Sequence, residues 1–524
     1  MIADQGIDKF KQILQEKKVS TSKPTIFLII SPQSRASLTH MFNLGLDNND
    51  NNKWTLAETF LKLSTLFKQM GVDYILDGSS AGDIALIESR EEFVHKWIKN
   101  YKTNNNKREA IWSKPPTSLS VSSTKKRIFN TSTNTTIGAS YFLDANEGTI
   151  VDNTIIDIDT NISTPLLISH CPGWICYAEK TSPQSLPYIS TSKSSQQITG
   201  VIIKKLLPKI MNDNPMYSNP YIVSLQPCYD KKLEGSRLDF FHDDINSQEI
   251  DLVLSTSEVW SLLEDDIGLE SQSKNTMMDI DNYETNEKGR PGTSIHSVSK
   301  YVRTLSPDNS EGKDYIENLF RCFSRDGLDL VLSSSSTGLR GGSGGYLEHI
   351  FRYASEQLLG ISLWNQPLDC KVGRNTDIAE IEVSGTLIRT INSDRDDNIT
   401  LKMGKAYGFR NIQSLMLKMK KGKCDLDLVE IMACPNGCNN GGGQLKVTAS
   451  DKETSAEANS RIAAVDQLYA TAVLSDPRES PLAQFLYSNT NLGSPYSSFA
   501  REILHTQYHS VPKLEEIAPL ASKW

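Results

Sequence analysis

In the first part of the chain, apolar runs typical of strands alternate with segments in which apolar residues have helical spacing. Residues 24–31, PTIFLIIS, form a short apolar run rich in β-branched side chains, which is typical of a buried strand. SPQSRAS then predicts a loop leading into a helix, and WTLAETFLKLSTLFKQMG at 54–71 has helical spacing. VDYILD at 72–77 predicts a second strand. Strand, helix and strand in this order predict a parallel α/β sheet.

Three later apolar runs share one feature, because each ends at a cysteine. TPLLISH is followed directly by Cys171, YIVSLQP by Cys228, and CDLDLVEIMA by Cys434. Ligands of parallel α/β sheets collect at the carboxyl ends of the strands. We therefore expect these three cysteines to converge on one point, which Cys438 reaches from the adjoining loop.

Two polar stretches interrupt the pattern, at 101–135 and 266–312. The first is rich in Asn, Ser, Thr and Lys and predicts a disordered insertion. A strand is predicted at 379–385, and helices are predicted near 313–323, 454–473 and 496–505. GLRGGSGG lacks the Gly-Lys-Ser/Thr ending of a phosphate loop, so it predicts a tight turn before a helix.

Composition narrows the class of protein. The 524 residues are 38% hydrophobic and 23% charged, with a net charge of -8 and a mean hydropathy of -0.38. An acidic chain disfavours broad binding to nucleic acid or anionic membranes, and no apolar run approaches the roughly 18 residues of a membrane span. The N-terminus, MIADQGIDKFKQILQEKK, predicts an amphipathic helix without a signal-peptide apolar region. We expect a cytosolic protein that binds neither nucleic acid nor membrane.

The eight cysteines have no disulfide role in a reducing cytosol. Four soft thiolates at one site select zinc, Cu(I) or an iron–sulfur cluster. Structural zinc usually uses two closely spaced cysteine pairs, whereas Cys171 and Cys228 come singly. Prolines flank the strand-end cysteines, and the glycines after Cys438 suit close backbone approach to a bulky ligand. A cluster is favoured over zinc, and the other four are predicted to be packing residues: Cys176, Cys322, Cys370 and Cys424.

Three long segments carry a family resemblance. SHCPGWICYAEK, LQPCYDKKLEGSR and VEIMACPNGCNNGGGQ resemble, in this order, the three signatures of iron-only hydrogenases. Their details are most similar to the eukaryotic iron-only hydrogenase-like family of cytosolic iron–sulfur protein assembly factors, also described as nuclear prelamin A recognition factor-like. The resemblance covers about residue 24 to the C-terminus apart from the insertions. It implies a two-lobed α/β fold with mostly parallel sheets and one buried [4Fe–4S] cluster between the lobes, held by Cys171, Cys228, Cys434 and Cys438.

Departures from the enzymes of this family bear on catalysis. By the resemblance, His170 stands where a hydrogenase has its proton-delivering cysteine, and Gln226 replaces a methionine beside the two-iron subsite. Met432 and Lys231, by contrast, have the same residue types as the corresponding positions of the hydrogenases. Glu88, Glu91 and Ser190 fall where a proton relay would run, although helix-surface acids and a strand-end hydroxyl also account for them. We expect a non-catalytic assembly factor.

Family members normally carry four further cysteines near the N-terminus for a second [4Fe–4S] cluster. No cysteine precedes Cys171 here, so either the gene model is truncated or the protein works with one cluster. One cluster is expected in this chain. The predicted organisation is an N-terminal helical remnant, a first part of the hydrogenase-like domain, a polar insertion, a second part of that domain and a C-terminal segment, at 1–23, 24–265, 266–312, 313–480 and 481–524.

By resemblance, the predicted function is transfer of clusters to cytosolic and nuclear apoproteins within the cytosolic iron–sulfur protein assembly machinery. The expected partners are the scaffold proteins, the targeting complex and apoprotein clients. Trp524 offers an indole and a carboxylate as a recognition unit, although Lys523 stands where the family has an acid. The location is the cytoplasm, with the nucleus as a second compartment. Two alternatives stay open: an iron-only hydrogenase-type redox enzyme, and a zinc-binding or structural interaction protein.

Overall fold

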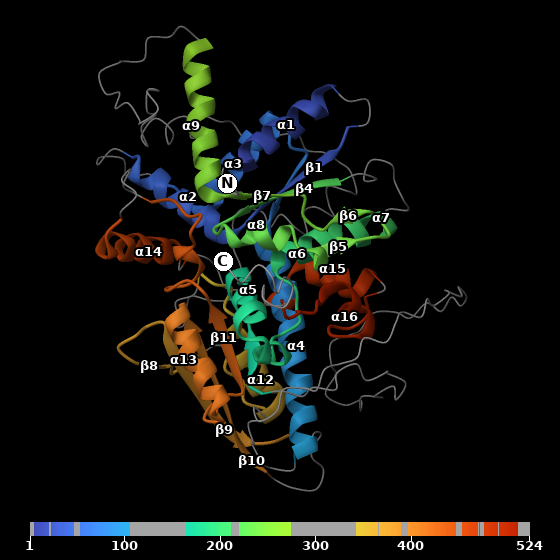
Figure 1. Ribbon diagram of the computed structural model, residues 1–524, viewed down its shortest axis with the longest axis vertical. Helices are drawn as coiled ribbons and strands as arrows, with labels where there is room; N and C mark the ends of the chain where they lie inside the picture. Colours follow the sequence, from blue (N-terminus) through green and yellow to red (C-terminus); the bar gives the residue numbers. More distant parts are fainter. Residues whose placement is uncertain are drawn as a thin grey trace, which may run out of the picture.

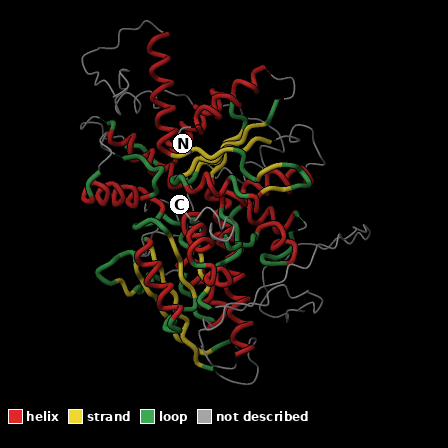
Figure 2. The backbone as a smooth tube through the Cα atoms, in the orientation of Figure 1, coloured by secondary structure: helices red, strands yellow, loops and turns green. Residues whose placement is uncertain are grey.

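The computed structural model covers the 524-residue chain in two α/β lobes, each built on one sheet (Figure 1, Figure 2). The residues that it describes are 5–19, 23–46, 53–104, 164–210, 220–273, 342–364, 366–388, 397–446, 453–469, 471, 476–490 and 492–511. Within these ranges, no helix is both long and apolar enough to cross a membrane.

The first lobe contains a four-stranded parallel sheet in the order β2-β1-β4-β7. Its strands are β1 (Thr25–Ile30), β2 (Tyr74–Asp77), β4 (Pro220–Gln226) and β7 (Leu252–Ser255). β1 is buried at five of its six positions, as expected for a strand covered on both faces. The predicted strands at 24–31, 72–77 and 221–227 and their parallel pairing are confirmed.

The second lobe contains a mixed five-stranded sheet in the order β3-β11-β10-β9-β8. Its strands are β3 (Leu166–Ile168), β8 (Lys371–Val372), β9 (Ile378–Thr386), β10 (Asn398–Tyr407) and β11 (Leu428–Met432). The β3–β11 and β11–β10 pairs are parallel, whereas the β10–β9 and β9–β8 pairs are antiparallel. A separate ribbon pairs β5 (Phe241–His242) with β6 (Ser247–Gln248).

Helices cover both sheets (Figure 1). In the first half they are α1 (Gln5–Val19), α2 (Pro32–Leu44), α3 (Leu56–Met70), α4 (Gly78–Asn104), α5 (Pro172–Thr181), α6 (Ser195–Val201), α7 (Leu207–Ile210), α8 (Asp230–Gly235) and α9 (Thr256–Ser273). In the second half they are α12 (Tyr346–Leu359), α13 (Phe409–Lys420), α14 (Ser455–Tyr469), α15 (Pro481–Asn489) and α16 (Ser498–Leu504). α1 packs against β7 and α9 and buries Phe10 and Leu14.

One local prediction was wrong, because SPQSRAS is not a loop. Ser31 is the N-cap of α2, and its Oγ accepts a hydrogen bond from Ser34 N at 3.2 Å. Pro32 occupies the first turn, where its missing N–H costs nothing. The sequence therefore contained a complete helix start that the loop interpretation overlooked.

The polar insertions begin later than predicted. α4 continues to Asn104, inside the predicted insertion at 101–135, and α9 continues to Ser273, beyond 265. The rest of both insertions, and the helix predicted near 313–323, lie outside the described residues. The domain boundaries stay a prediction.

α4 joins the two lobes. It starts directly after β2 of the first sheet, and its Trp97 Nε1 donates to Asp427 Oδ1, next to β11 of the second sheet, at 3.4 Å. One hydrophobic core includes Phe27 of the first sheet, Phe93 of α4 and Met403 of the second sheet. The two lobes are therefore packed on a shared helix.

Candidate metal centre

Cysteines from both sheets line one cavity between the lobes. Cys171 follows β3 and is the N-cap of α5, with Pro172 in the first helical turn. Cys228 follows β4, and Cys434 and Cys438 follow β11. All four line the cavity. The predicted convergence is found, although β4 belongs to the first sheet and β3 and β11 to the second, so the cysteines do not share one sheet edge.

The loop that carries Cys434 and Cys438 is shaped by Gly437. Its φ of 79° lies in the left-handed region, and a Cβ there would collide with Ser343 Oγ. That hydroxyl accepts a hydrogen bond from Cys438 N at 3.0 Å. The glycine thus lets the loop turn tightly enough to aim Cys438 into the cavity.

Two of the glycines after Cys438 approach the backbone of the first lobe closely, and their predicted approach to a bulky ligand stays a prediction. A Cβ on Gly441 would collide with the carbonyl oxygen of Pro227, and Gly443 N donates to the same oxygen at 3.0 Å. The partner in close approach is therefore the backbone beside Cys228. These contacts bring the loop of the second lobe onto the cysteine of the first lobe.

The four thiols strongly oppose ionisation in the cluster-free chain. Burial raises the pKa of each of them, and it is the largest cause in every case. Burial, Cys171 and Asp230 together raise the pKa of Cys434 to about 12. The pKa of Cys438 is raised further by the neighbouring thiols of Cys171, Cys434 and Cys228. Such a set becomes four thiolates only when a cationic centre compensates their charge.

Two backbone N–H groups and one imidazole nitrogen lie close to the sulfurs. Ala433 N donates to Cys171 Sγ at 3.4 Å, and Asp230 N donates to Cys228 Sγ at 3.3 Å. His170 Nε2 lies 3.4 Å from Cys438 Sγ. Burial, with a further contribution from Lys231, lowers the pKa of His170 to about 3, so the imidazole is neutral. Donors to ligand sulfur are the means by which proteins tune cluster potentials.

The donor set fits a cluster better than a single ion. Among the described residues, no three His, Cys, Asp or Glu side chains gather closely enough to hold one metal ion. A [4Fe–4S] cluster presents a separate iron to each cysteine thiolate, so its ligands stand farther apart. Four buried cysteines around one cavity match that requirement.

Other residues singled out in the sequence are placed as follows. Gln226, Lys231 and Met432 line the cysteine cavity. Cys370 and Cys424 pack against hydrophobic cores, and Cys176 is half-buried. Cys322, Lys523 and Trp524 lie outside the described residues.

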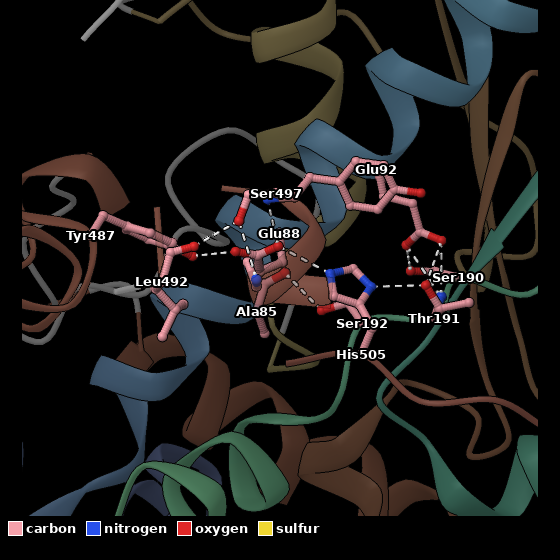
Figure 3. A network of polar contacts seen from close by, with 12 residues as sticks. Ala85, Glu88, Glu92, Ser190, Thr191, Ser192, Tyr487, Leu492, Ser497 and His505 are labelled. Carbon is pink, nitrogen blue, oxygen red and sulfur yellow. Dashed lines mark hydrogen bonds and ion pairs between the residues drawn. The ribbon is translucent and has the colours of Figure 1, made fainter. Parts of the chain in front are cut away.

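Glu88, one of the two acids of the predicted proton relay, belongs to the polar network of Figure 3, and Glu91 has separate partners. Glu88 Oε2 lies 3.0 Å from His505 Nε2 and accepts a hydrogen bond from Tyr496 N at 2.9 Å. The hydroxyl of Tyr487 donates to the other oxygen of Glu88. Glu91 accepts from Tyr353 Oη at 2.6 Å, and burial raises its pKa.

Glu92, which the sequence interpretation missed, holds Ser190 in the same network (Figure 3). Ser190 Oγ donates to Glu92 Oε2 at 2.5 Å, and Thr191 Oγ1 donates to Glu92 Oε1 at 3.0 Å. Thr191 Oγ1 also lies 2.8 Å from His505 Nδ1. Burial raises the pKa of Glu92, but Lys96, His505 and Ser190 outweigh it and lower the pKa to about 2. Glu92 lies one helical turn after Glu88, a spacing that places both on one face of α4.

The chain matches the family described as "Iron only hydrogenase large subunit, C-terminal domain" over residues 117–442. It is 31% identical to the rat protein named "Cytosolic iron-sulfur assembly component 3", over 100% of this chain and 82% of the relative. It is 30% identical to the zebrafish protein named "Cytosolic Fe-S cluster assembly factor narfl", over 100% of this chain and 96% of the relative.

Solved structures with a similar fold include apo [FeFe]-hydrogenase HydA1 from Chlamydomonas reinhardtii, in a variant form. The TM-score is 0.62, the sequence identity is 21%, and the match covers 96% of this chain and 99% of that one. A structure described as showing stepwise hydrogenase H-cluster assembly matches with a TM-score of 0.60 and 21% identity, over the same shares of the two chains. At this identity the likeness establishes the two-lobed fold.

Proposed function

This chain belongs to the iron-only hydrogenase large-subunit family, and we propose that it is a component of cytosolic iron–sulfur protein assembly. In this role it carries a [4Fe–4S] cluster and helps transfer clusters to cytosolic and nuclear apoproteins. The observation that carries the proposal is the meeting of Cys171, Cys228, Cys434 and Cys438 at one cavity between the lobes. The names of the relatives supply the cellular process.

The residues of the cavity have separate tasks in this proposal. The four cysteines hold the cluster, which when bound supplies iron, sulfide and electron-transfer chemistry. Ala433 N and Asp230 N steady the sulfurs of Cys171 and Cys228. Gly441 and Gly443 hold the cysteine loop against the carbonyl of Pro227, beside Cys228.

The proposal includes no turnover of a small-molecule substrate. His170 carries no thiol for proton delivery, and its ring lies against Cys438. Glu88 and Ser190 are engaged by His505 and Glu92 and do not form part of the cavity lining described here. Their hydrogen bonds tie α4 to the C-terminal segment, which is a structural task.

A redox enzyme of the hydrogenase class is the second candidate, because Lys231 and Met432 line the cavity as the resemblance predicts. Hydrogen evolution from reduced methyl viologen by the reconstituted chain would favour it over the assembly factor. A zinc-binding interaction protein is the third, and stoichiometric zinc without sulfide would favour that reading.

The proposed partners are the early scaffold and the late targeting complex of the same machinery, together with apoprotein clients. Trp524 is the proposed contact for the targeting complex, because an indole and a terminal carboxylate form a compact recognition unit. The proposed location is the cytoplasm, with the nucleus as the second compartment.

Iron and acid-labile sulfide content, measured on protein purified without oxygen, tests the proposal first. We expect about four iron and four sulfide per chain, with broad visible absorbance. Incubation of the loaded chain with an apoprotein that accepts a [4Fe–4S] cluster then tests transfer, which we expect to raise the activity of the acceptor. Absence of iron after anaerobic reconstitution contradicts the cluster, and a loaded chain that never donates contradicts the transfer role.

A further inference from the structure

A second cavity, of about 400 Å³, lies beside the loop that carries Cys434 and Cys438. Its inner wall is formed by three buried residues at the end of β10 and on α14: Lys405, Tyr407 and Ile462. Its outer wall includes Asn436 of the cysteine loop, which is exposed. The lining of the cavity thus combines a buried lysine with an exposed residue of the cysteine loop.

Lys405 is the chemically unusual member of this cavity. Its side chain is 9% exposed, and its Nζ makes no hydrogen bond or ion pair with the described residues. It lies 4.9 Å from the ring centroid of Tyr407. The carboxylate with the strongest influence on it is Glu430, whose two oxygens accept hydrogen bonds from Tyr407 Oη and Leu347 N, both at 2.8 Å. Because Lys405 lines the cavity and its Nζ has no ion-pair partner among the described residues, an anionic group inside the cavity can pair with it.

Two carboxylates line the same cavity, and both support the cysteine loop. Asp377 Oδ1 accepts a hydrogen bond from Asn436 N at 2.7 Å. Asp466 Oδ1 accepts one from Asn439 Nδ2, also at 2.7 Å. The lining of the cavity therefore offers one cationic group, two anionic groups and the apolar surface of Ile462.

We propose that this cavity binds a free aliphatic α-amino acid. The carboxylate of the ligand pairs with Lys405, its ammonium group lies near Asp377 and Asp466, and its side chain packs on Ile462 and Ala463. A phosphate or another multiply charged anion fits poorly, because the two aspartates repel it. A simple cation fits poorly as well, because Lys405 repels it. A zwitterion satisfies both kinds of group.

Occupancy of this site is coupled to the cysteine loop, and this part of the inference rests on the proposed function. Asp377 and Asp466 hold Asn436 and Asn439, which flank Cys438 on both sides. A ligand that steadies these aspartates steadies the loop in its closed form. We expect bound amino acid to slow the loss of iron from the loaded chain several-fold.

Isothermal titration calorimetry with L-leucine tests the site on the full chain, both cluster-free and loaded. We expect saturable binding to one site. Two analogues isolate the charges: 4-methylpentanoate lacks the ammonium group, and 3-methylbutylamine lacks the carboxylate. Each is expected to bind at least about tenfold more weakly than leucine, since each loses one charge-assisted contact.

Lys405→Met should abolish leucine binding, while Lys402→Met should leave it unchanged. Lys402 lies on the same strand, and its ammonium already pairs with Asp425 at 2.8 Å, so it is a matched control. Circular dichroism on both variants shows that they are folded. Lys405→Arg should retain measurable binding, because it keeps the positive charge.

Three results would overturn the site: no saturable heat with leucine up to about 10 mM, unchanged binding by folded Lys405→Met, or equal binding of 4-methylpentanoate. Iron release to a chelator, followed with and without leucine, tests the coupling. Binding without any change in the rate of release would refute the coupling and keep the site. A chain that never takes up iron would refute the proposed function, and titration of that cluster-free chain would still decide the site.

Discussion

The loop from Cys434 to Cys438 borders two cavities of opposite character. On the cysteine side the lining contains four cysteines, and burial raises the pKa of their thiols. On the Lys405 side the lining holds fixed charges, two of which support the loop through Asn436 and Asn439. The loop from Cys434 to Cys438 therefore carries two of the proposed ligands on one side, and on the other it is supported by hydrogen bonds to two carboxylates.

The two cavities also differ in how the chain encodes them. The cysteine cavity draws on three compact segments, each with its cysteine at the end of a strand. The Lys405 cavity draws its lining from several separated elements, with four residues from α14 and one or two from each of the others, and these residues form no sequence motif. A motif identifies the first kind of site, whereas only the assembled fold reveals the second.

The largest effect, on iron content, is expected from substitution of the cysteines that line the first cavity. Cys434→Ala or Cys438→Ala should lower iron from about four per chain to near zero, since a cluster missing a ligand is lost. The melting temperature should also fall, because bound cluster stabilises the native chain by mass action. Iron analysis and calorimetry on anaerobic protein measure both quantities. Cys370→Ala is the control and should keep its iron, since Cys370 packs against a hydrophobic core; equal losses in all three variants would refute the ligand assignment.

Gly441→Ala should break the contact between the loop and the first lobe. The added Cβ collides with the backbone carbonyl of Pro227, so we expect a loss of about 2–4 kcal/mol in the free energy of unfolding, together with lower iron content. Guanidinium unfolding measures the first quantity. Gly373→Ala meets no atom within 4 Å and should change stability by less than about 0.5 kcal/mol. Similar costs for the two substitutions would show that the close approach to Pro227 is unimportant.

Glu92 provides a comparison with a site remote from both cavities. Its pKa of about 2 in the folded chain lies below the ordinary value of 4.5, so its ionised form stabilises the fold. That contribution is fully present above about pH 4.5 and is lost as the pH falls toward 2; it amounts to roughly 3 kcal/mol. Glu92→Gln should remove it and flatten the acid limb of a stability–pH profile while iron content at neutral pH stays normal. An unchanged acid limb would contradict the assignment.

The smallest effect is expected at His170. Removing its ring in His170→Ala deletes the contact with Cys438 Sγ at 3.4 Å, so the reduction potential of the bound cluster should become more negative, on the order of tens of millivolts. His170→Gln retains an N–H donor and should lie between the two. Redox titration followed by electron paramagnetic resonance measures the shift. A potential that does not move in either variant would show that the imidazole does not act on the sulfur.

The fold and the cysteine site followed largely from local pattern. Strand periodicity located β1, β2 and β4, and the strand-end cysteines located the cavity. Their division between two sheets did not follow, because pairing partners are set by tertiary packing rather than by spacing along the chain. The contact of Glu88 with His505 joins residues 417 positions apart, and the partner of Gly441 is a carbonyl of the other lobe. Neither leaves a trace in the neighbouring sequence.

α4 has a mechanical consequence for the exchange of a cluster. Its 27 residues span about 40 Å at 1.5 Å per residue, and the helix runs from the end of β2 into the core under the second sheet. A helix that packs in both lobes opposes a hinge motion between them. We therefore expect exchange of a cluster to need displacement of the glycine-rich turn at 441–443, which is held to Pro227 by a backbone hydrogen bond from Gly443.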